Sequence, residues 1–319
     1  MRKLYALILL TLPVMLSAQQ DVQFTQFMFN RLYYNPAVAG SGGAICVSGF
    51  HRSQWVGFEG APTTQNVIAN IPLNVLHGGI GLSIVNDEIG FFNNTSVELS
   101  YAYQFQLANG TLGVGLGASF LNKALDASTW IPSDQGTIFG DNDPFIAATD
   151  ANGFQIDLSF GAYYESQDWW AGVSSTRVIE SRAEVSSFNA AEDLASFRNA
   201  RHYYLMGGYN WAIPGTNWEL QPALLSKFSA GSAATFDLNA MGVYNKKVWG
   251  GVTYRLQDAI GAMVGYQITP AFRAGYSYDI PTSALSGAAS GSHEIMLQYC
   301  FKIEIPPRPK GSYRNIRFL

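Results

Sequence analysis

The feature that most constrains this chain is an alternation of apolar and polar side chains with a period of two residues. Between Ser96 and Leu107, one set of alternate residues is apolar or aromatic, and the other is mostly small or polar. Alternate side chains of a β-strand point to opposite faces, so such a stretch predicts a strand with one apolar face. The alternation recurs at 155–160, 235–240, 271–279 and 294–301. The chain is therefore predicted to be all-β.

A soluble β-sandwich also alternates, so the composition of the two faces has to decide between a sandwich and a membrane barrel. The exposed face of a soluble sheet is rich in Lys and Glu, but here the polar set is mainly Ser, Gln, Gly and Thr. The apolar set repeatedly ends in Tyr, Trp or Phe, and only 13% of all residues are charged. These properties favour a transmembrane antiparallel β-barrel with lipid outside, a polar lumen inside and aromatic residues at both interfaces.

The number of predicted strands is about fourteen, and bacterial single-chain barrels have an even number. We expect them at 43–52, 64–72, 78–86, 94–106, 111–121, 154–164, 168–176, 201–211, 217–227, 233–244, 247–255, 259–268, 271–280 and 292–302. The connection after every second strand is short. Connections after the third, fifth, seventh and thirteenth strands are often longer, and two of them reach Asn122–Gly153 and Arg177–Ala200. Short periplasmic turns and longer extracellular loops are typical of outer-membrane barrels.

The first residues predict export from the cytoplasm. Arg2 and Lys3 precede an apolar run that ends at Leu16, and Ser17-Ala18 follows, which together are typical of a secretory signal peptide. A membrane anchor is the alternative, but the run is short for crossing a bilayer. We therefore expect a signal peptide at 1–18, a periplasmic or lumenal segment at 19–42, an outer-membrane barrel at 43–302 and a basic periplasmic tail at 303–319.

The two segments that flank the predicted barrel have distinct compositions. The N-terminal segment carries Phe24, Phe27, Met28, Phe29, Tyr33 and Tyr34. Because so many aromatic residues avoid water, we expect this segment to pack across the barrel mouth or to lie in the lumen. The tail is basic and carries Arg308, Lys310, Arg314 and Arg317. It is either a solvated end or a docking strip for an acidic periplasmic partner.

Strand parity assigns a set of charged side chains to the lumen. These residues are Arg52, Glu98, Asp157, Glu219, Asp237, Arg255, Arg273, Asp279 and Glu294. Charges of both signs on one inner face favour mutual pairing, which would fill and stiffen the barrel. A hydrated pore is the alternative.

Two extracellular regions are candidate contacts for a partner or for secreted cargo. Arg52, Gln54, Trp55 and Phe58 lie where the first strand enters its loop. The favoured expectation is that a cation–π contact between Trp55 and Arg52 anchors this loop, and the alternative is that these residues face a partner. The second region is the 122–153 loop, which displays Trp130, Phe139 and Phe145 among several aspartates. A calcium site at 141–143 is disfavoured because a later carboxylate is missing at the expected place.

The two cysteines belong to the first and last predicted strands. Cys46 lies near the start of the first strand and Cys300 near the end of the last. These strands are antiparallel neighbours in a closed barrel, and both thiols face inward by parity, so we expect them to approach one another. Unbonded, packed cysteines are the favoured expectation because a cross-strand disulfide strains the ladder. A disulfide at the barrel seam is the alternative.

The sequence offers little that predicts an enzyme. A Gly-rich phosphate loop and a metal-binding spacing among the four histidines are both missing from it, so we expect neither catalysis nor a cofactor. The formal net charge of −4 also makes a nucleic-acid partner unexpected. Membrane lipid is the expected surrounding of the barrel.

The chain resembles a known family along its length, most specifically in residues 19–90. Asp21–Met28, Tyr33–Gly40, Arg52–Phe58 and Gly79–Gly90 are similar to the opening of the PorP/SprF family, although Val22 stands where Pro is expected. The closing Asn315–Leu319 is similar to the basic, aromatic ending of that family. Members are outer-membrane proteins of the type IX secretion system of the Bacteroidetes.

The resemblance implies a structural and docking role in protein secretion and gliding motility. The implied partners are periplasmic ring proteins, a peptidoglycan-binding lipoprotein and secreted cargo with a C-terminal sorting domain. The resemblance supplies no catalytic residues. An outer-membrane diffusion channel for small or hydrophobic solutes is the alternative function.

Overall fold

The structure of the protein is a computed structural model. It describes residues 21–125, 151–187, 195–229, 233–287 and 289–301. The predicted signal peptide, the 126–150 part of the long loop and the basic tail lie outside these residues, and so do Trp130, Phe139, Phe145, Arg308, Lys310, Arg314 and Arg317.

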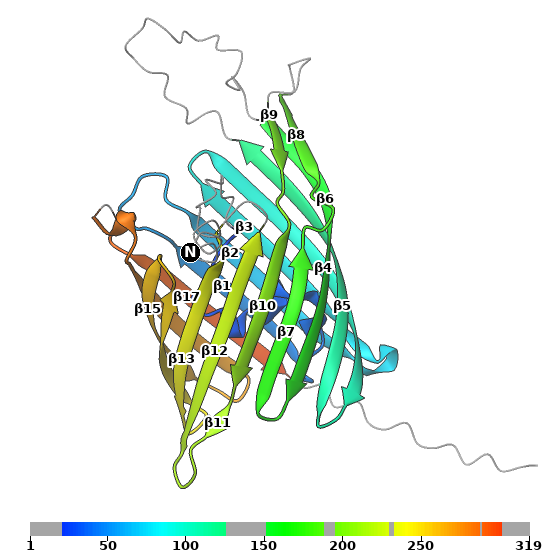
Figure 1. The fold of residues 1–319 in the computed structure, drawn as a ribbon, viewed down its shortest axis with the longest axis vertical. Helices are drawn as coiled ribbons and strands as arrows, with labels where there is room; N and C mark the ends of the chain where they lie inside the picture. Colours follow the sequence, from blue (N-terminus) through cyan, green and yellow to red (C-terminus); the bar gives the residue numbers. More distant parts are fainter. Residues whose placement is uncertain (1–20, 126–150, 188–194, 230–232, 288, 302–319) are drawn as a thin grey trace, which may run out of the picture.

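The described chain forms a closed antiparallel β-barrel (Figure 1). Its strands are β1 (Ile45–Ser53), β2 (Thr63–Leu73), β3 (Gly78–Ile89), β4 (Phe92–Leu107), β5 (Gly110–Leu125), β6 (Ala151–Ser166), β7 (Trp169–Thr176), β8 (Arg182–Ser187), β9 (Ala195–Arg198), β10 (His202–Tyr209), β11 (Trp211–Ala212), β12 (Trp218–Ser229), β13 (Thr235–Tyr244), β14 (Val248–Arg255), β15 (Ala259–Gln267), β16 (Phe272–Pro281) and β17 (Ser292–Phe301).

The wall consists of fourteen strands, which confirms the predicted fold. β1 pairs with both β2 and β17, so the first and last strands close the barrel. β7 pairs directly with β10, and β11 continues the line of β10 after Asn210. The remaining two strands, β8 and β9, form a hairpin that stands above the wall and pairs with β6 (Figure 1).

Several predicted boundaries differ from the structure. The region 177–200 was expected to be a loop, but it contains β8 and β9. The connection after β3 was expected to be long, but only Gly90 and Phe91 separate β3 from β4. The polar residues near 93 and 122 belong to paired strand ends, because β4 and β5 keep their ladder as far as the Phe92–Leu125 pair. Side-chain polarity alone does not end a strand whose backbone groups still have partners.

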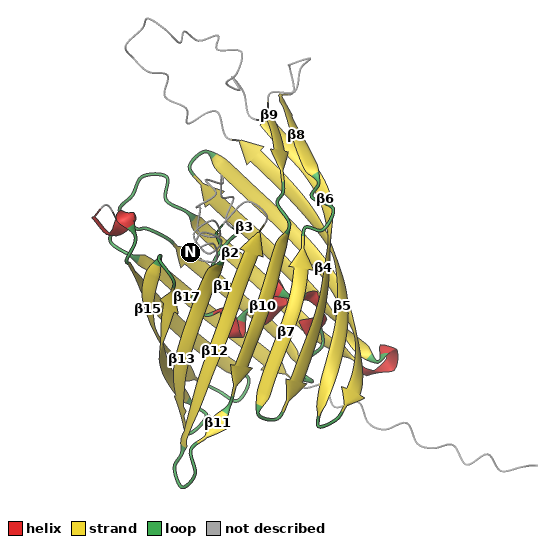
Figure 2. Ribbon diagram, in the orientation of Figure 1, coloured by secondary structure: helices red, strands yellow, loops and turns green. Residues whose placement is uncertain are grey.

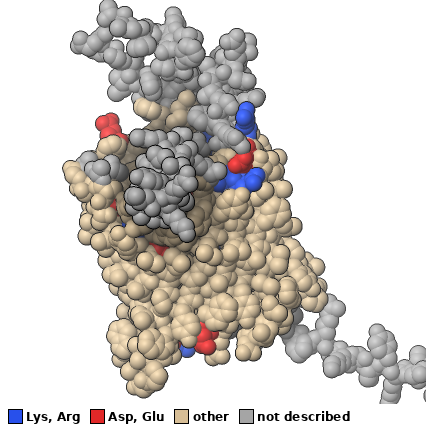
Figure 3. Space-filling model, viewed as in Figure 1, with Lys and Arg blue, Asp and Glu red and all other residues tan. Residues whose placement is uncertain are grey.

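The outer surface of the wall has the polarity that a bilayer requires. Charged side chains gather mainly near the two ends of the face seen in Figure 3, and uncharged side chains cover the wall between them. Aromatic side chains project outward near both rims, as in the belts of membrane barrels. The rim with the short turns carries Tyr103, Trp169, Trp211, Trp218, Tyr244, Tyr266 and Tyr299, and the opposite rim carries Phe120, Phe154, Tyr203 and Tyr254. By loop length, the first rim is periplasmic and the second is extracellular.

Residues 21–41 lie inside the barrel, and we call this segment the plug. It contains the short helices η1 (Phe27–Phe29), α2 (Arg31–Tyr34) and η2 (Pro36–Val38), which are the red elements in the lumen in Figure 2. Two further short helices, η3 (Asn74–Leu76) and η4 (Ala284–Gly287), lie in connections between wall strands. The plug contacts the wall from Asp21, beside Arg177 at the extracellular end of β7, down to Gly40, beside Gly79 at the periplasmic start of β3.

The apolar core lies between the plug and the inner face of the wall. Phe24, Phe27, Leu32 and Tyr34 of the plug are almost fully buried. The wall contributes inward side chains to the same core, among them Phe50, Tyr163, Trp170, Tyr204, Met206, Leu225, Met241, Trp249, Met263 and Met296. The inner face is therefore partly apolar, where a polar lumen was expected. The aromatic plug requires apolar partners, and flexible Met side chains fill irregular gaps well.

Small residues on the wall let the plug backbone come close. The Cα of Gly40, at φ +75°, lies against the backbone of Gly79, and neither position has room for a Cβ. A Cβ on Gly115 would lie 2.5 Å from the Cα of Ala37. Similar close approaches to the plug occur at Gly81, Gly113, Gly161, Gly172, Gly261 and Gly275. The inner wall is thus shaped to the plug by its glycines.

Replacing Gly115 by Ala should therefore destabilise the folded protein by about 1–3 kcal/mol, because the added methyl group overpacks the contact with the plug. Gly49→Ala is the matched control, since a Cβ there meets nothing within 4 Å. It should be neutral or slightly stabilising in a strand. Urea unfolding in lipid vesicles, followed by Trp fluorescence, measures both. Equal losses for the two variants would contradict a wall fitted to the plug.

Candidate functional site

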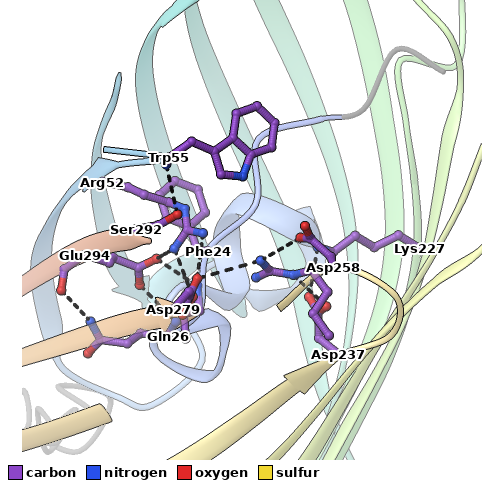
Figure 4. Close-up of polar contacts among 12 residues, drawn as sticks. Phe24, Gln26, Arg52, Trp55, Lys227, Asp237, Asp258, Asp279, Ser292 and Glu294 are labelled. Carbon is purple, nitrogen blue, oxygen red and sulfur yellow. Dashed lines mark hydrogen bonds and ion pairs between the residues drawn. The ribbon is translucent and has the colours of Figure 1, made fainter. Parts of the chain in front are cut away.

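The plug is attached to the wall through a buried carboxylate. The backbone N–H groups of Thr25 and Gln26 donate to the two carboxylate oxygens of Glu294 on β17, at 2.8 and 2.9 Å (Figure 4). The Thr25 hydroxyl donates to Asp279 on β16 at 2.6 Å and accepts from Arg52 on β1 at 2.9 Å. Two residues of the plug thus bind it to three strands. The hydrogen bonds are strong ones, because their partners on the wall are charged.

The same carboxylates belong to a larger group of charges, which we call the lumenal ion cluster (Figure 4). Its members are Arg52, Lys227, Asp237, Arg255, Asp258, Asp279 and Glu294. Arg52 pairs with Asp279 at 2.7 Å and with Glu294 at 3.0 Å. Arg255 contacts Asp237 at 3.0 Å and Asp258 at 3.2 Å, and it approaches Asp279 to 3.8 Å.

The lumenal ion cluster is largely buried, which raises the energetic cost of leaving any of its charges unpaired. The side chains of Arg52 and Glu294 are 2% and 0% exposed, and Lys227 lies 2.9 Å from the fully buried Asp237. Charges removed from water lose much hydration energy, so each must be compensated by a partner. These charges are paired with one another and shielded from water, whereas charges that line an open aqueous pore are hydrated.

A second polar contact holds the extracellular end of the plug. Asp21 pairs with Arg177 at 2.6 Å and accepts from the Tyr204 hydroxyl at 2.7 Å. Burial opposes ionisation of Asp21, but Arg177 and Tyr204 stabilise its charge and lower the pKa of the carboxyl below its ordinary value. The carboxylate of Asp21 is therefore a charged anchor, although it lies inside the barrel.

The opposite side of the plug contacts β6 and β7. Arg31 donates to the Tyr163 hydroxyl at 2.5 Å, lies 3.3 Å from Glu165, and stacks 4.2 Å from the centre of the Trp170 ring. The Asn35 side chain donates to the backbone carbonyls of Ala162 and Val173. The plug is therefore held on several sides of the lumen.

The structure places the other predicted lumenal charges on the inner face, each with its own local partner. Asp157 accepts from the backbone N–H groups of Ile179 and Ser181, so it anchors the turn that follows β7. Glu98 accepts from two serines, and Arg273 stacks 4.5 Å from the Phe29 ring. Glu219 lies near the periplasmic rim, 3.8 Å from the exposed Lys246.

The expected cation–π contact between Arg52 and Trp55 is wrong. Arg52 points into the lumen toward Asp279 and Glu294, whereas the Trp55 ring points away from them (Figure 4). The backbone holds this loop instead. Trp55 has φ +51° and donates its N–H to Ser292, and Val56 pairs through its backbone with Ser290 and Gly291. Phe58 is 48% exposed, and the backbone N–H of Gln54 is bonded to Pro62.

The two cysteines form a disulfide between β1 and β17, where unbonded thiols were the favoured expectation. They are direct register partners with Cα atoms 4.1 Å apart, and both point inward. The antiparallel closure of the barrel brings them together despite 254 residues of separation.

A cavity of about 240 Å³ opens at the periplasmic mouth beside the root of the plug. Its lining includes the Gly40–Gly43 turn and the side chains of Gln104, Thr111, Tyr163 and Glu165. Among the described residues, no group of His, Cys, Asp and Glu side chains has the geometry of a metal site. The described helices are all too short or too polar to cross a bilayer.

Some of these residues were absent from the predicted set. Lys227 shares the inward parity of Glu219 on the same strand, so the alternation could have found it. Thr25, Arg31 and Asn35 had no comparable signal, because their partners come from distant strands. The inward glycines were a signal of close backbone approach that composition alone does not locate.

Comparison with known proteins places the chain in a family. A family model described as "Type IX secretion system membrane protein PorP/SprF" matches residues 16–299. The chain belongs to this family. The match covers the plug and nearly the whole barrel of this PorP/SprF protein. No curated protein matches the chain.

Solved outer-membrane barrels resemble the chain at low identity. The toluene transporter TodX of Pseudomonas putida is 10% identical, with 87% of this chain and 95% of TodX covered and a TM-score of 0.48. Omp33 of Acinetobacter baumannii is 12% identical, with 82% and 100% covered and a TM-score of 0.42. The KdgM porin is 8% identical, with 80% and 99% covered and a TM-score of 0.37. Likenesses this weak carry no argument about function.

Removal of one cation should expose the strength of the lumenal ion cluster. Arg52→Met leaves Asp279 and Glu294 without their closest cation, and it should cost about 3–5 kcal/mol of unfolding free energy. Lys246→Met is the control, because Lys246 is 84% exposed and its pairing should be worth less than about 1 kcal/mol. Urea unfolding in vesicles compares the two. A loss for Arg52→Met as small as that of the control would contradict the role of the cluster.

Proposed function

We propose that this PorP/SprF protein is a plugged outer-membrane barrel that serves as a docking component of type IX secretion and is not itself a conduit. Family membership supports the place in the secretion system. The observation that carries the docking role is the filled lumen: the plug contacts β16 and β17 on one side and β6 and β7 on the other. A barrel filled in this way leaves its two rims as its working surfaces.

The extracellular surface that we propose for docking is the β1–β2 loop with the adjoining β3–β4 turn. Val56 and Phe58 are 38% and 48% exposed, and Ile89 on the neighbouring turn is 41% exposed. A hydrogen bond from the Gly90 N–H to the Gly60 carbonyl joins the loop and the turn, and Glu59 is exposed beside them. Apolar side chains on a backbone held in this way suit a protein contact. We propose that secreted cargo with a C-terminal sorting domain is the partner here.

At the periplasmic rim, the cavity beside the Gly40–Gly43 turn supports a second docking surface. It is lined by both polar and apolar residues, it opens at the periplasmic mouth, and it is adjacent to the root of the plug. Periplasmic ring proteins and a peptidoglycan-binding lipoprotein are the partners that we propose there, with the basic tail contributing through Arg308, Lys310, Arg314 and Arg317. In this proposal the chain reaches the outer membrane after cleavage of its signal peptide and takes part in gliding as well as secretion.

Conductance separates docking from diffusion. The intact protein in a planar bilayer should show no steady ion current, because the plug fills the lumen. Deletion of residues 21–41 should produce one, since it removes the plug and leaves the β1 strand. A steady current through the intact protein would support the alternative, a diffusion channel for small or hydrophobic solutes. A deletion variant that folds but does not conduct would show that the plug is not what closes the lumen.

Loss of the exposed apolar side chains at the β1–β2 loop should weaken docking. We expect Val56→Ser combined with Phe58→Ser to reduce recovery of crosslinked type IX components and cargo from native membranes by roughly tenfold or more, the effect of losing interface anchors. Ile179→Ser is the control, because Ile179 is an apolar residue that is at least as exposed, at 54%, on another extracellular turn. Unchanged recovery with the double variant would remove this surface from the proposal.

A further inference from the structure

The seam between β1 and β17 is the one junction of the barrel wall that joins the two ends of the folded chain. Three direct register pairs on its inner face are bonded through their side chains. Cys46 and Cys300 form the disulfide at the periplasmic end, and Gln298 donates to Ser48 at 2.6 Å near the middle. Arg52 pairs with Glu294 at 3.0 Å toward the extracellular end.

The plug crosses this seam from inside. The N–H and hydroxyl of Thr25 together contact β1, β16 and β17 through Arg52, Asp279 and Glu294. The Gln26 N–H adds a second bond to Glu294. All of these groups are almost fully buried, so water does not compete for them. The plug thus bridges both sides of the junction at the end opposite the disulfide.

We propose that the plug is a clasp on the barrel seam, and that it and the Cys46–Cys300 disulfide form a lock at each end of the same junction. The disulfide restrains only the periplasmic end. Separation of β1 from β17 at the extracellular end has to pull Arg52 from Glu294 and break the contacts of Thr25. It would also leave backbone N–H and C=O groups unpaired beside lipid. The wall is therefore closed to lateral opening at its seam.

The proposal distinguishes two sides of the plug. Contacts of Thr25 and Gln26 act on the seam, whereas those of Arg31 act on β6, across the lumen. A plug that only filled space would stabilise the wall on all sides. A clasp stabilises β1 and β17 selectively. This difference can be measured by following amide exchange strand by strand.

The experiment is hydrogen–deuterium exchange of the full-length protein in lipid nanodiscs. Thr25→Val removes the hydroxyl and keeps the shape of the side chain, and mild reduction with dithiothreitol opens the half-buried disulfide. In the reduced Thr25→Val protein, amides of 45–53 and 292–301 should exchange about tenfold faster than in the oxidised wild type. Amides of 92–107 and 110–125 should keep their wild-type rates. Arg31→Met, also reduced, is the matched control, and its seam amides should exchange no faster than those of the reduced wild type.

Other outcomes overturn the proposal. If the seam amides of the reduced Thr25→Val protein exchange no faster than in the oxidised wild type, as expected for the amides of β4 and β5, neither the plug nor the disulfide locks the seam. If Arg31→Met gives the same selective acceleration, the plug acts as a filler and not as a clasp. Should Thr25→Val fail to fold, the reduced wild type and the Cys46→Ser, Cys300→Ser double variant still test the periplasmic lock. Their exchange should rise from the periplasmic ends of β1 and β17, and uniform acceleration around the wall would contradict the lock.

Discussion

The structure depends on one constraint, which is that backbone polar groups in lipid must find partners within the protein. A sheet meets this constraint only when its last strand pairs with its first. The pairing of β1 with β17 therefore closes the wall and leaves no edge of its first or last strand facing the lipid. Closure, however, creates an interior. The N-terminal segment before β1 occupies this interior with aromatic side chains and a short run of helical turns.

The filled interior explains why apolar and ionic groups share the lumen. Near the middle, the plug packs its aromatic residues on Met and aromatic side chains of the wall. Toward the extracellular end, where residues 25 and 26 present backbone N–H groups, the wall supplies Glu294 and Asp279 together with the cations that compensate them. The polar and apolar zones are thus matched to the plug. This match supports the proposal that the two rims are the docking surfaces.

Much of this architecture could be predicted from the alternation of side chains. Parity placed Arg52, Asp237 and Glu294 on the inner face, and the antiparallel closure brought Cys46 near Cys300. The path of the plug could not be predicted in this way, because it depends on hollows made by glycines of several strands that are distant in sequence. The expected contact between Arg52 and Trp55 is absent for a related reason. Arg52 is on the inner face of β1, where its partners are carboxylates on β16 and β17. These partners are distant in sequence from the loop that contains Trp55.

The disulfide also has a mechanical consequence. Both flanking segments leave the wall at its periplasmic end, one as the root of the plug before β1 and the other after Phe301. A pulling force on the chain beyond β17 reaches Cys300 first, and the covalent bond passes part of it to Cys46. The load is then shared by the ladders that β1 makes with β2 and β17 makes with β16, both of which would have to shear together. A barrel joined in this way can be pulled from the periplasm without its terminal strand being peeled from the wall.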